Sequence, residues 1–156
     1  MGLPAFQTVL DEHGPALHRY LVGAVGIHDA NDCFQETMIA ALRAYPTLPH
    51  DDNIGGWLFT IAHRKVIDAA RANGRRPVPV GVMADSAGPV HDAPALFDDD
   101  LWSRVGGLPS KQRSAVLLRF VADRPYCEIA VALECSEAAA RQNVRAGLQR
   151  LREDVK

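Results

Sequence analysis

The sequence predicts an all-α protein made of two small helical domains that a flexible linker joins. Apolar residues recur at the three- and four-residue spacing of amphipathic helices through most of the 156 residues. No segment alternates apolar and polar residues convincingly with the period of two that is typical of strands. Residues 77–97 show neither pattern and are rich in Pro, Gly, Ala and Asp. They predict an acidic linker between a domain at 1–76 and a domain at 98–156.

Three helices are expected in the first domain. Gly14-Pro15 should kink or interrupt the first, because proline lacks the backbone N–H that a helix interior uses. Asp29 or Asn31 is expected to cap the second, and Pro46 to stop it. The expected ranges are about Leu3–Val25, about Asp29–Tyr45, and Ile54 to about Asn73-Gly74.

The second and third of these helices carry distinct polar faces. In the second helix the apolar stripe includes Cys33 and Leu42, and the opposite face carries Asp32, Gln35 and Glu36. The third helix is apolar on most sides, with Trp57 on the side that packs. It keeps one narrow cationic stripe, which consists of Thr60, His63, Arg64, Asp68, Arg71 and Arg75.

The second domain is expected to contain four shorter helices. The second of these, over 110–123, should place Phe120 inside. The last two helices, Tyr126–Leu133 and Glu137 to about Glu153, with a short turn between them, describe a helix-turn-helix. Ser136 is a good N-cap for the last helix, whose polar face carries Arg141, Gln142 and Arg145. Such side chains contact base edges and phosphates.

The composition excludes several classes of protein. Apolar residues make up 47% and charged residues 23%, as in soluble domains. No apolar run is long enough for a membrane-spanning helix, and the first residues lack the pattern of a secretory signal. Three cysteines are too few for a disulfide scaffold and fit a reducing cytosol. The net charge of −2 does not indicate a nucleic-acid binder, but residues 51–76 and 101–156 each carry a basic excess.

Three segments together resemble a bacterial RNA polymerase sigma factor of the extracytoplasmic-function group. They are DCFQETMIAALRAY at 32–45, WLFTIAHRKVIDAAR at 57–71, and the segment 108–153. The resemblance implies two helical domains on a tether, without a metal, another cofactor or catalysis. It implies binding to the clamp and flap of core RNA polymerase and to promoter DNA, in the bacterial cytoplasm. An anti-sigma factor as regulator is a further expectation of the resemblance.

The resemblance also assigns residues to each partner. Asp32, Gln35 and Glu36 are expected to face the polymerase clamp. The residues expected at the minus-ten element are Asn53, Thr60, His63, Arg64, Arg71 and Arg75. The residues expected at the minus-thirty-five element are Ser136, Arg141, Gln142, Asn143 and Arg145.

Departures from the family pattern keep a second function open. Glu134 stands where a helix-ending Gly is usual, which asks a non-Gly residue for an unfavourable backbone, and Ala138-Ala139 replaces a common Gly-Thr. The alternative is a sigma-like decoy or adaptor that binds polymerase or a regulator without productive promoter reading. Ala146, Leu148 and Gln149 stand where bases are frequent, and this thinned basic face of the last helix supports the alternative. A zinc site at Cys127 and Cys135 is disfavoured, because their spacing matches no common ligand pair and buried structural thiols explain the cysteines better. Asp32 and Glu36 lack any third group that would make them catalytic, and an enzyme is not expected.

Overall fold

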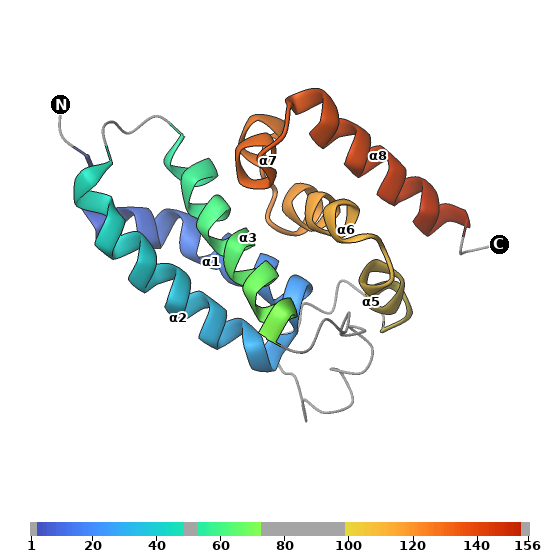
Figure 1. Ribbon diagram of the computed structural model, residues 1–156, viewed down its shortest axis with the longest axis horizontal. Coiled ribbons are helices and arrows are strands. Elements are labelled where there is room, and N and C mark those ends of the chain that lie inside the picture. The colour runs from blue at the N-terminus through green and yellow to red at the C-terminus, as the bar shows by residue number, and fades with distance from the viewer. Residues whose placement is uncertain (1–2, 49–52, 73–98, 154–156) are drawn as a thin grey trace.

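The computed structural model describes residues 3–48, 53–72 and 99–153, and over these ranges its regular secondary structure is entirely helical (Figure 1). The predicted linker at 77–97 lies outside the described residues. The N-terminal half contains α1 Phe6–Val25, α2 Ile27–Ala44, the 3₁₀ turn η1 Tyr45–Thr47, and α3 Ile54–Ala72. The C-terminal half contains α5 Asp99–Gly106, α6 Ser110–Val116, the π-helical turn η2 Leu117–Val121, α7 Tyr126–Leu133, and α8 Glu137–Glu153.

Helices α1 and α2 form a hairpin that turns at a single residue. Gly26 has φ 87°, a backbone conformation that residues with a Cβ rarely adopt, and its N–H donates to the Val22 carbonyl. Gly26 is therefore the N-cap of α2, and the expected cap at Asp29 or Asn31 is wrong. Of the two outcomes expected at Gly14-Pro15, an interruption is absent, because α1 runs through Pro15 and fully buried Leu17 and Tyr20 anchor the turn after it.

Helix α3 begins at a side-chain cap. Asn53 has φ 59°, and its Oδ1 accepts the Gly56 N–H at 3.1 Å. Asparagine is among the residues that best tolerate this conformation and this capping role. The cap fixes the start of α3 so that Leu58, Phe59 and Ala62 enter the core. Trp57 is partly buried and packs on Tyr45, as expected for a core aromatic, with 6.1 Å between ring centroids.

The helix expected over 110–123 changes its winding at Leu117. From there a π-helical turn runs to Val121, and the Ala122 N–H donates to the Leu117 carbonyl. A π turn inserts one extra residue per turn and rotates everything after it relative to an α-helix. As a result Phe120, expected inside, is 55% exposed.

The helix-turn-helix is present at α7–α8, with an unusual residue in its turn. Glu134 adopts the left-handed conformation at φ 55° and ψ 49°, as the turn requires. The Cys135 N–H then donates to the Ala130 carbonyl at 3.0 Å and ends α7. Ser136 caps the start of α8, because its Oγ accepts the Ala139 N–H at 3.0 Å.

The Ser136 cap should contribute measurably to stability. In Ser136→Ala the Ala139 N–H loses its acceptor, and we expect the free energy of unfolding to fall by about 1 kcal/mol. Urea unfolding followed by circular dichroism measures this. A variant as stable as the wild type would show that water replaces the cap without loss.

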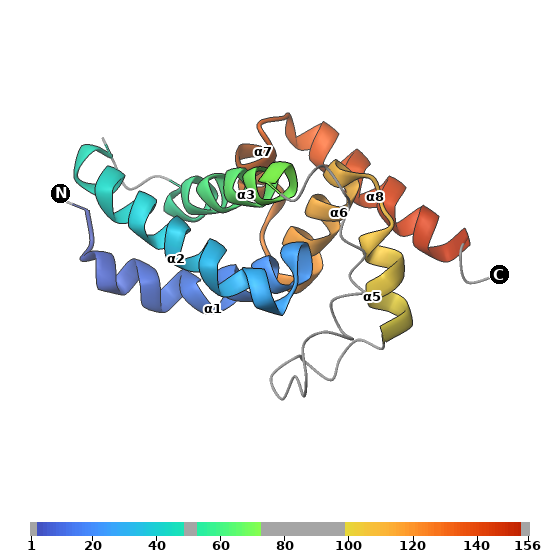
Figure 2. The same cartoon turned by 60° about the horizontal axis from the view of Figure 1, so that its bottom comes forward.

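The two halves share one hydrophobic core. The buried cluster includes Tyr20 and Phe59 from the N-terminal half and Leu117, Leu118 and Ile129 from the C-terminal half. Helix α7 lies along α3, and α6 with η2 approaches the end of α1 (Figure 2). No helix in the described ranges is both long and apolar enough to cross a membrane. The packing of side chains near the contact between the halves therefore depends on residues from both halves.

Candidate nucleic-acid interface

The outer face of α2 combines carboxylates with exposed aliphatic side chains. Asp32, Gln35 and Glu36 are exposed there, as predicted. Ile39 and Leu42 lie on the same face and are 51% and 55% exposed. The prediction that Leu42 belongs to the buried apolar stripe is therefore wrong. At 100° per residue these five side chains lie on one side of the helix. We call this set (Asp32, Gln35, Glu36, Ile39 and Leu42) the α2 surface; two neighbouring exposed aliphatics are typical of a contact surface.

The polar side of α3 lies beside α7. Thr60 Oγ1 lies 2.7 Å from the Gly56 carbonyl oxygen of its own helix and 3.2 Å from the Val131 carbonyl oxygen of α7. Arg64 Nη2 donates to Glu134 Oε1 at 2.7 Å. That hydrogen bond, and then the guanidinium charge, holds the pKa of Glu134 below its usual range. We call Thr60, His63, Arg64 and Arg71 the α3 stripe.

His63, expected at the minus-ten element, is less accessible than the arginines of the α3 stripe. Its ring is half-buried, with Nδ1 3.1 Å from the Tyr20 hydroxyl oxygen. Burial lowers the pKa of His63, so the ring is neutral at neutral pH and carries no charge to attract a phosphate. Arg71 is exposed at the end of α3, whereas Arg75 lies outside the described residues.

The exposed side of α8 presents the predicted groove-contacting side chains. Arg141, Gln142 and Arg145 are exposed, and Asn143 is half-buried. Arg141 pairs with Glu137 at 3.4 Å, and its guanidinium lies 5.0 Å from the centre of the Tyr126 ring. Ser136, predicted to touch DNA, uses its hydroxyl to accept a bond from the start of the same helix.

A stack of three side chains beside α8 was not predicted. The Tyr126 ring lies under the Arg141 guanidinium, and the Arg119 guanidinium is 4.5 Å from the same ring. Such contacts hold both cations in place. Arg119 lies on η2, so the regular helical spacing assumed for the sequence did not bring it to Tyr126.

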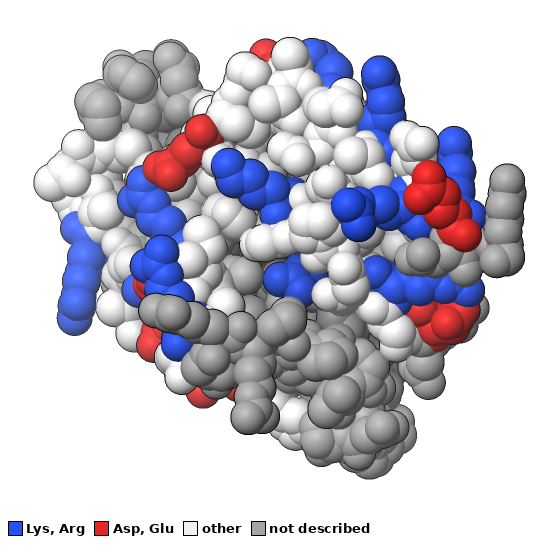
Figure 3. All heavy atoms as spheres, turned by 45° about the vertical axis from the view of Figure 1, so that its right-hand side comes forward, with Lys and Arg blue, Asp and Glu red and all other residues white. Residues whose placement is uncertain are grey.

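Lys and Arg are more widespread than Asp and Glu on the face shown in Figure 3.

The cysteines lie in three different environments. Cys33 is buried, Cys135 is half-buried and Cys127 is exposed, so the expectation of buried thiols holds only for Cys33. Burial, followed by the nearby charge of Glu36, raises the pKa of Cys33 to about 11, and the thiol stays protonated. Among the residues that the structure describes, no group of three His, Cys, Asp or Glu side chains could hold a metal ion.

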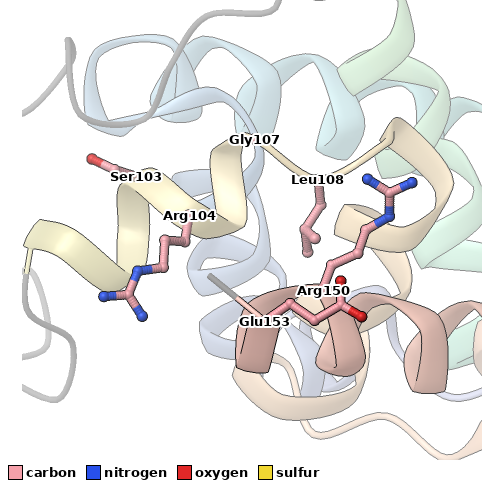
Figure 4. A pocket seen from close by; sticks show the side chains of 6 residues that line it. All are labelled: Ser103, Arg104, Gly107, Leu108, Arg150 and Glu153. Carbon is pink, nitrogen blue, oxygen red and sulfur yellow. The ribbon is translucent and has the colours of Figure 1, made fainter. Parts of the chain in front are cut away.

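A shallow hollow lies between α5 and α8, away from the predicted sites (Figure 4). Its lining includes Leu108 and two cations, Arg104 and Arg150. Arg104 is already paired with Asp100. Glu153 adds a carboxylate to the same lining, so the hollow carries both signs of charge.

Comparison with known families defines the class of this two-part helical chain. The profile of Sigma-70 region 2 matches residues 9–76, which contain α1, α2 and α3. The profile of Sigma-70, region 4 matches residues 98–151, which contain the helix-turn-helix. Both regions of a sigma-70-type initiation factor are thus present, in family order; initiation factors of this class are not classical enzymes.

Similar proteins narrow the class to one family. The ECF RNA polymerase sigma factor SigD of Mycobacterium tuberculosis is 31% identical, over 97% of this chain and 77% of that protein. The chain belongs to the ECF RNA polymerase sigma factors. SigG of the same organism is 29% identical over 81% of this chain, and the match spans only 42% of SigG.

Solved structures show the same fold. The sigma factor RpoE of Bartonella quintana, in its complex with the anti-sigma factor NepR, matches with a TM-score of 0.77 and 24% identity. The match covers 97% of this chain and 96% of that one. CnrH, in complex with the cytosolic domain of CnrY, matches with a TM-score of 0.71 and 22% identity, over 97% of this chain and 87% of CnrH.

Proposed function

We propose that the chain is an alternative sigma factor that binds core RNA polymerase in the bacterial cytoplasm and directs promoter recognition, melting and initiation. The observation that carries this proposal is the presence of Sigma-70 regions 2 and 4 in order on one chain. Residues 1–76 act as the unit for polymerase and the minus-ten element, and 98–156 as the unit for the minus-thirty-five element. Residues 77–97 connect them.

The α2 surface is the proposed contact with the polymerase clamp. Glu36 and Asp32 supply negative charge. Ile39 and Leu42 supply exposed apolar area, and its removal from water favours binding. A surface of this kind suits a partner with basic residues around an apolar patch. Neither aliphatic side chain is needed by the core of the free chain, which favours a role in binding.

The α3 stripe and α8 are the proposed contacts with promoter DNA. Arg64 and Arg71 can pair with phosphates of the non-template strand, with Asn53 at the N-terminal end of the same helix. On α8, Arg141, Gln142, Asn143 and Arg145 are proposed to enter the major groove, where Arg reads guanine and Gln or Asn reads adenine. The Tyr126 ring holds Arg141 for that contact.

An anti-sigma factor is the proposed regulator. RpoE of Bartonella quintana forms a complex with the anti-sigma factor NepR, and CnrH forms a complex with the cytosolic domain of CnrY. The match to RpoE over 97% of this chain supports the proposal that an anti-sigma factor binds this chain too. No metal or other cofactor is required by the proposed function.

Transcription with purified core polymerase tests the proposed function. We expect the chain to direct initiation from specific sites on a pool of genomic fragments, detected by sequencing transcript 5′ ends. Arg145→Ala should weaken initiation by about tenfold or more if the side chain contacts a base, whereas Arg152→Ala, an exposed arginine near the end of α8, should not.

The same assay separates the proposed function from the decoy alternative. Polymerase binding without any specific initiation would favour a decoy or adaptor and contradict the proposal. An equal loss in the Arg145 and Arg152 variants would contradict the proposed groove contact, because it would reflect only a change in charge.

A further inference from the structure

We propose that the free chain masks its own promoter-contacting stripe, with α7 closed over α3 and Glu134 occupying Arg64 in place of a DNA phosphate. This inference rests on the proposed function of the α3 stripe. It assigns Glu134 a role that its place in the helix-turn-helix does not suggest. DNA and α7 then compete for one side of α3.

The contacts between α3 and α7 fall on the residues proposed to meet the minus-ten element. Thr60 reaches the Val131 carbonyl, and Arg64 donates to Glu134. At the start of α3, a Cβ built on Gly55 would lie 2.6 Å from a carboxylate oxygen of Glu128 on α7, so the two helices approach closely there. A single strand of DNA cannot follow this side of α3 while α7 lies on it.

A second group of contacts holds the halves together away from the stripe. Arg19 Nε on α1 donates to the Val121 carbonyl at 3.2 Å. Arg124 lies over the Phe59 ring, 5.5 Å from its centre, and within 3.3 Å of His13. Gly23 packs so tightly on Leu117 that a Cβ there would lie 2.7 Å from the Leu117 methyl group. The contact between the halves therefore combines the apolar packing of Gly23 on Leu117 with polar contacts made by Arg19 and Arg124.

Glu134 is suited to stand in for a phosphate. Its carboxylate accepts a charge-assisted bond from Arg64, as a phosphate oxygen would. Its backbone has the left-handed conformation that glycine adopts without strain, so the turn gains nothing locally from a glutamate. In the part of the chain that the structure describes, the hydrogen-bond partner of its side chain belongs to the other half.

The exposure of this pair makes the closure reversible. Arg64 and Glu134 side chains are 62% and 66% exposed, and exposed ion pairs shift an equilibrium by only about two- to fivefold. DNA phosphates can therefore displace Glu134 once a partner has drawn the halves apart. The pair biases the chain toward the closed form without locking it.

Binding of single-stranded DNA to the full-length chain tests the inference. The probe is a fluorescein-labelled, single-stranded DNA pool of random sequence, measured by anisotropy at physiological salt. We expect Glu134→Gln to bind the pool about two- to fivefold more tightly than the wild type. The matched control is Glu12→Gln, which removes the same charge at an exposed position on α1, outside the residues proposed to contact DNA. Equal affinities in the two variants would overturn the inference.

A second pair of variants tests the apolar packing between the halves at Gly23. Gly23→Ala places a methyl group against Leu117 and Trp102, whereas Gly14→Ala, on the same helix, meets its nearest atom at 3.6 Å within the N-terminal half. Both substitutions favour the helix equally. We expect tighter DNA binding in Gly23→Ala alone, with circular dichroism and thermal melting showing that both variants fold.

The outcomes distinguish this inference from the proposed function. Specific initiation by the wild type, with all four variants binding DNA as the wild type does, would overturn the closure and leave the proposed function standing. Tighter binding in Glu134→Gln and Gly23→Ala, with no initiation in the transcription assay, would support the closure and contradict the proposed function.

Discussion

Glu36→Lys is expected to weaken binding to core RNA polymerase by about a hundredfold or more while leaving the fold intact. Glu36 is exposed on the α2 surface, about one helical turn from both Asp32 and Ile39, so the substitution reverses a charge where the partner is proposed to be basic. Close charge pairs at protein interfaces are coupled by several kcal/mol, which accounts for an effect of this size. Exposed substitutions usually change stability by no more than about 0.5 kcal/mol.

Competition with a labelled wild-type chain for core polymerase measures this effect. The matched control is Glu12→Lys, which makes the same charge change at an exposed position on α1. Glu12→Lys should compete as the wild type does. If Glu36→Lys competes equally well, the clamp is bound by another surface.

Phe59→Ala is expected to lower the free energy of unfolding by about 3–5 kcal/mol. Phe59 is fully buried on α3, edge-on to Tyr20 at 5.9 Å between centroids. The Arg124 guanidinium of the C-terminal half covers its other side. Removing the ring leaves a cavity that fixed neighbours from both halves cannot readily fill, so the loss should affect the whole molecule.

Urea unfolding followed by circular dichroism and by tryptophan fluorescence tests this effect and the shared core together. Trp57 and Trp102 report on the two halves, and we expect one coincident transition in the wild type and in Phe59→Ala. Ile39→Ala, at an exposed position, should change stability by about 0.5 kcal/mol or less. Separate transitions for the two probes would show that the halves unfold independently.

Local features of the fold could be predicted from the sequence. Three features depend only on residues close together in the chain. They are the apolar and polar sides of α3, the turn between α7 and α8, and the Ser136 cap. The unfavourable backbone expected at Glu134 was confirmed, because the geometry of the turn imposes the left-handed conformation on whichever residue stands there. The exposed side of α2 followed from the spacing of Asp32 and Glu36.

Features that depend on distant residues could not be predicted. Periodicity placed Leu42 inside because it cannot show where the neighbouring helices end. It placed Phe120 inside because a π turn leaves no clear mark in the sequence. It described Thr60, His63 and Arg64 as one free cationic stripe, whereas Val131, Tyr20 and Glu134 contact them in the fold. Each of these contacts joins residues more than 40 positions apart.

The contact between α1 and η2 also bears on how the chain folds as the ribosome makes it. Arg19 meets Val121 across 102 positions, and His13 meets Arg124 across 111. Helices α1 to α3 therefore leave the ribosome with the apolar surface around Gly23 and Phe59 uncovered until η2 and α7 have been synthesised. During that interval the nascent N-terminal half presents a surface that chaperones bind and that favours aggregation. Chains that stop before Leu117 should accumulate as aggregates or be degraded, because the segment that covers this surface is missing.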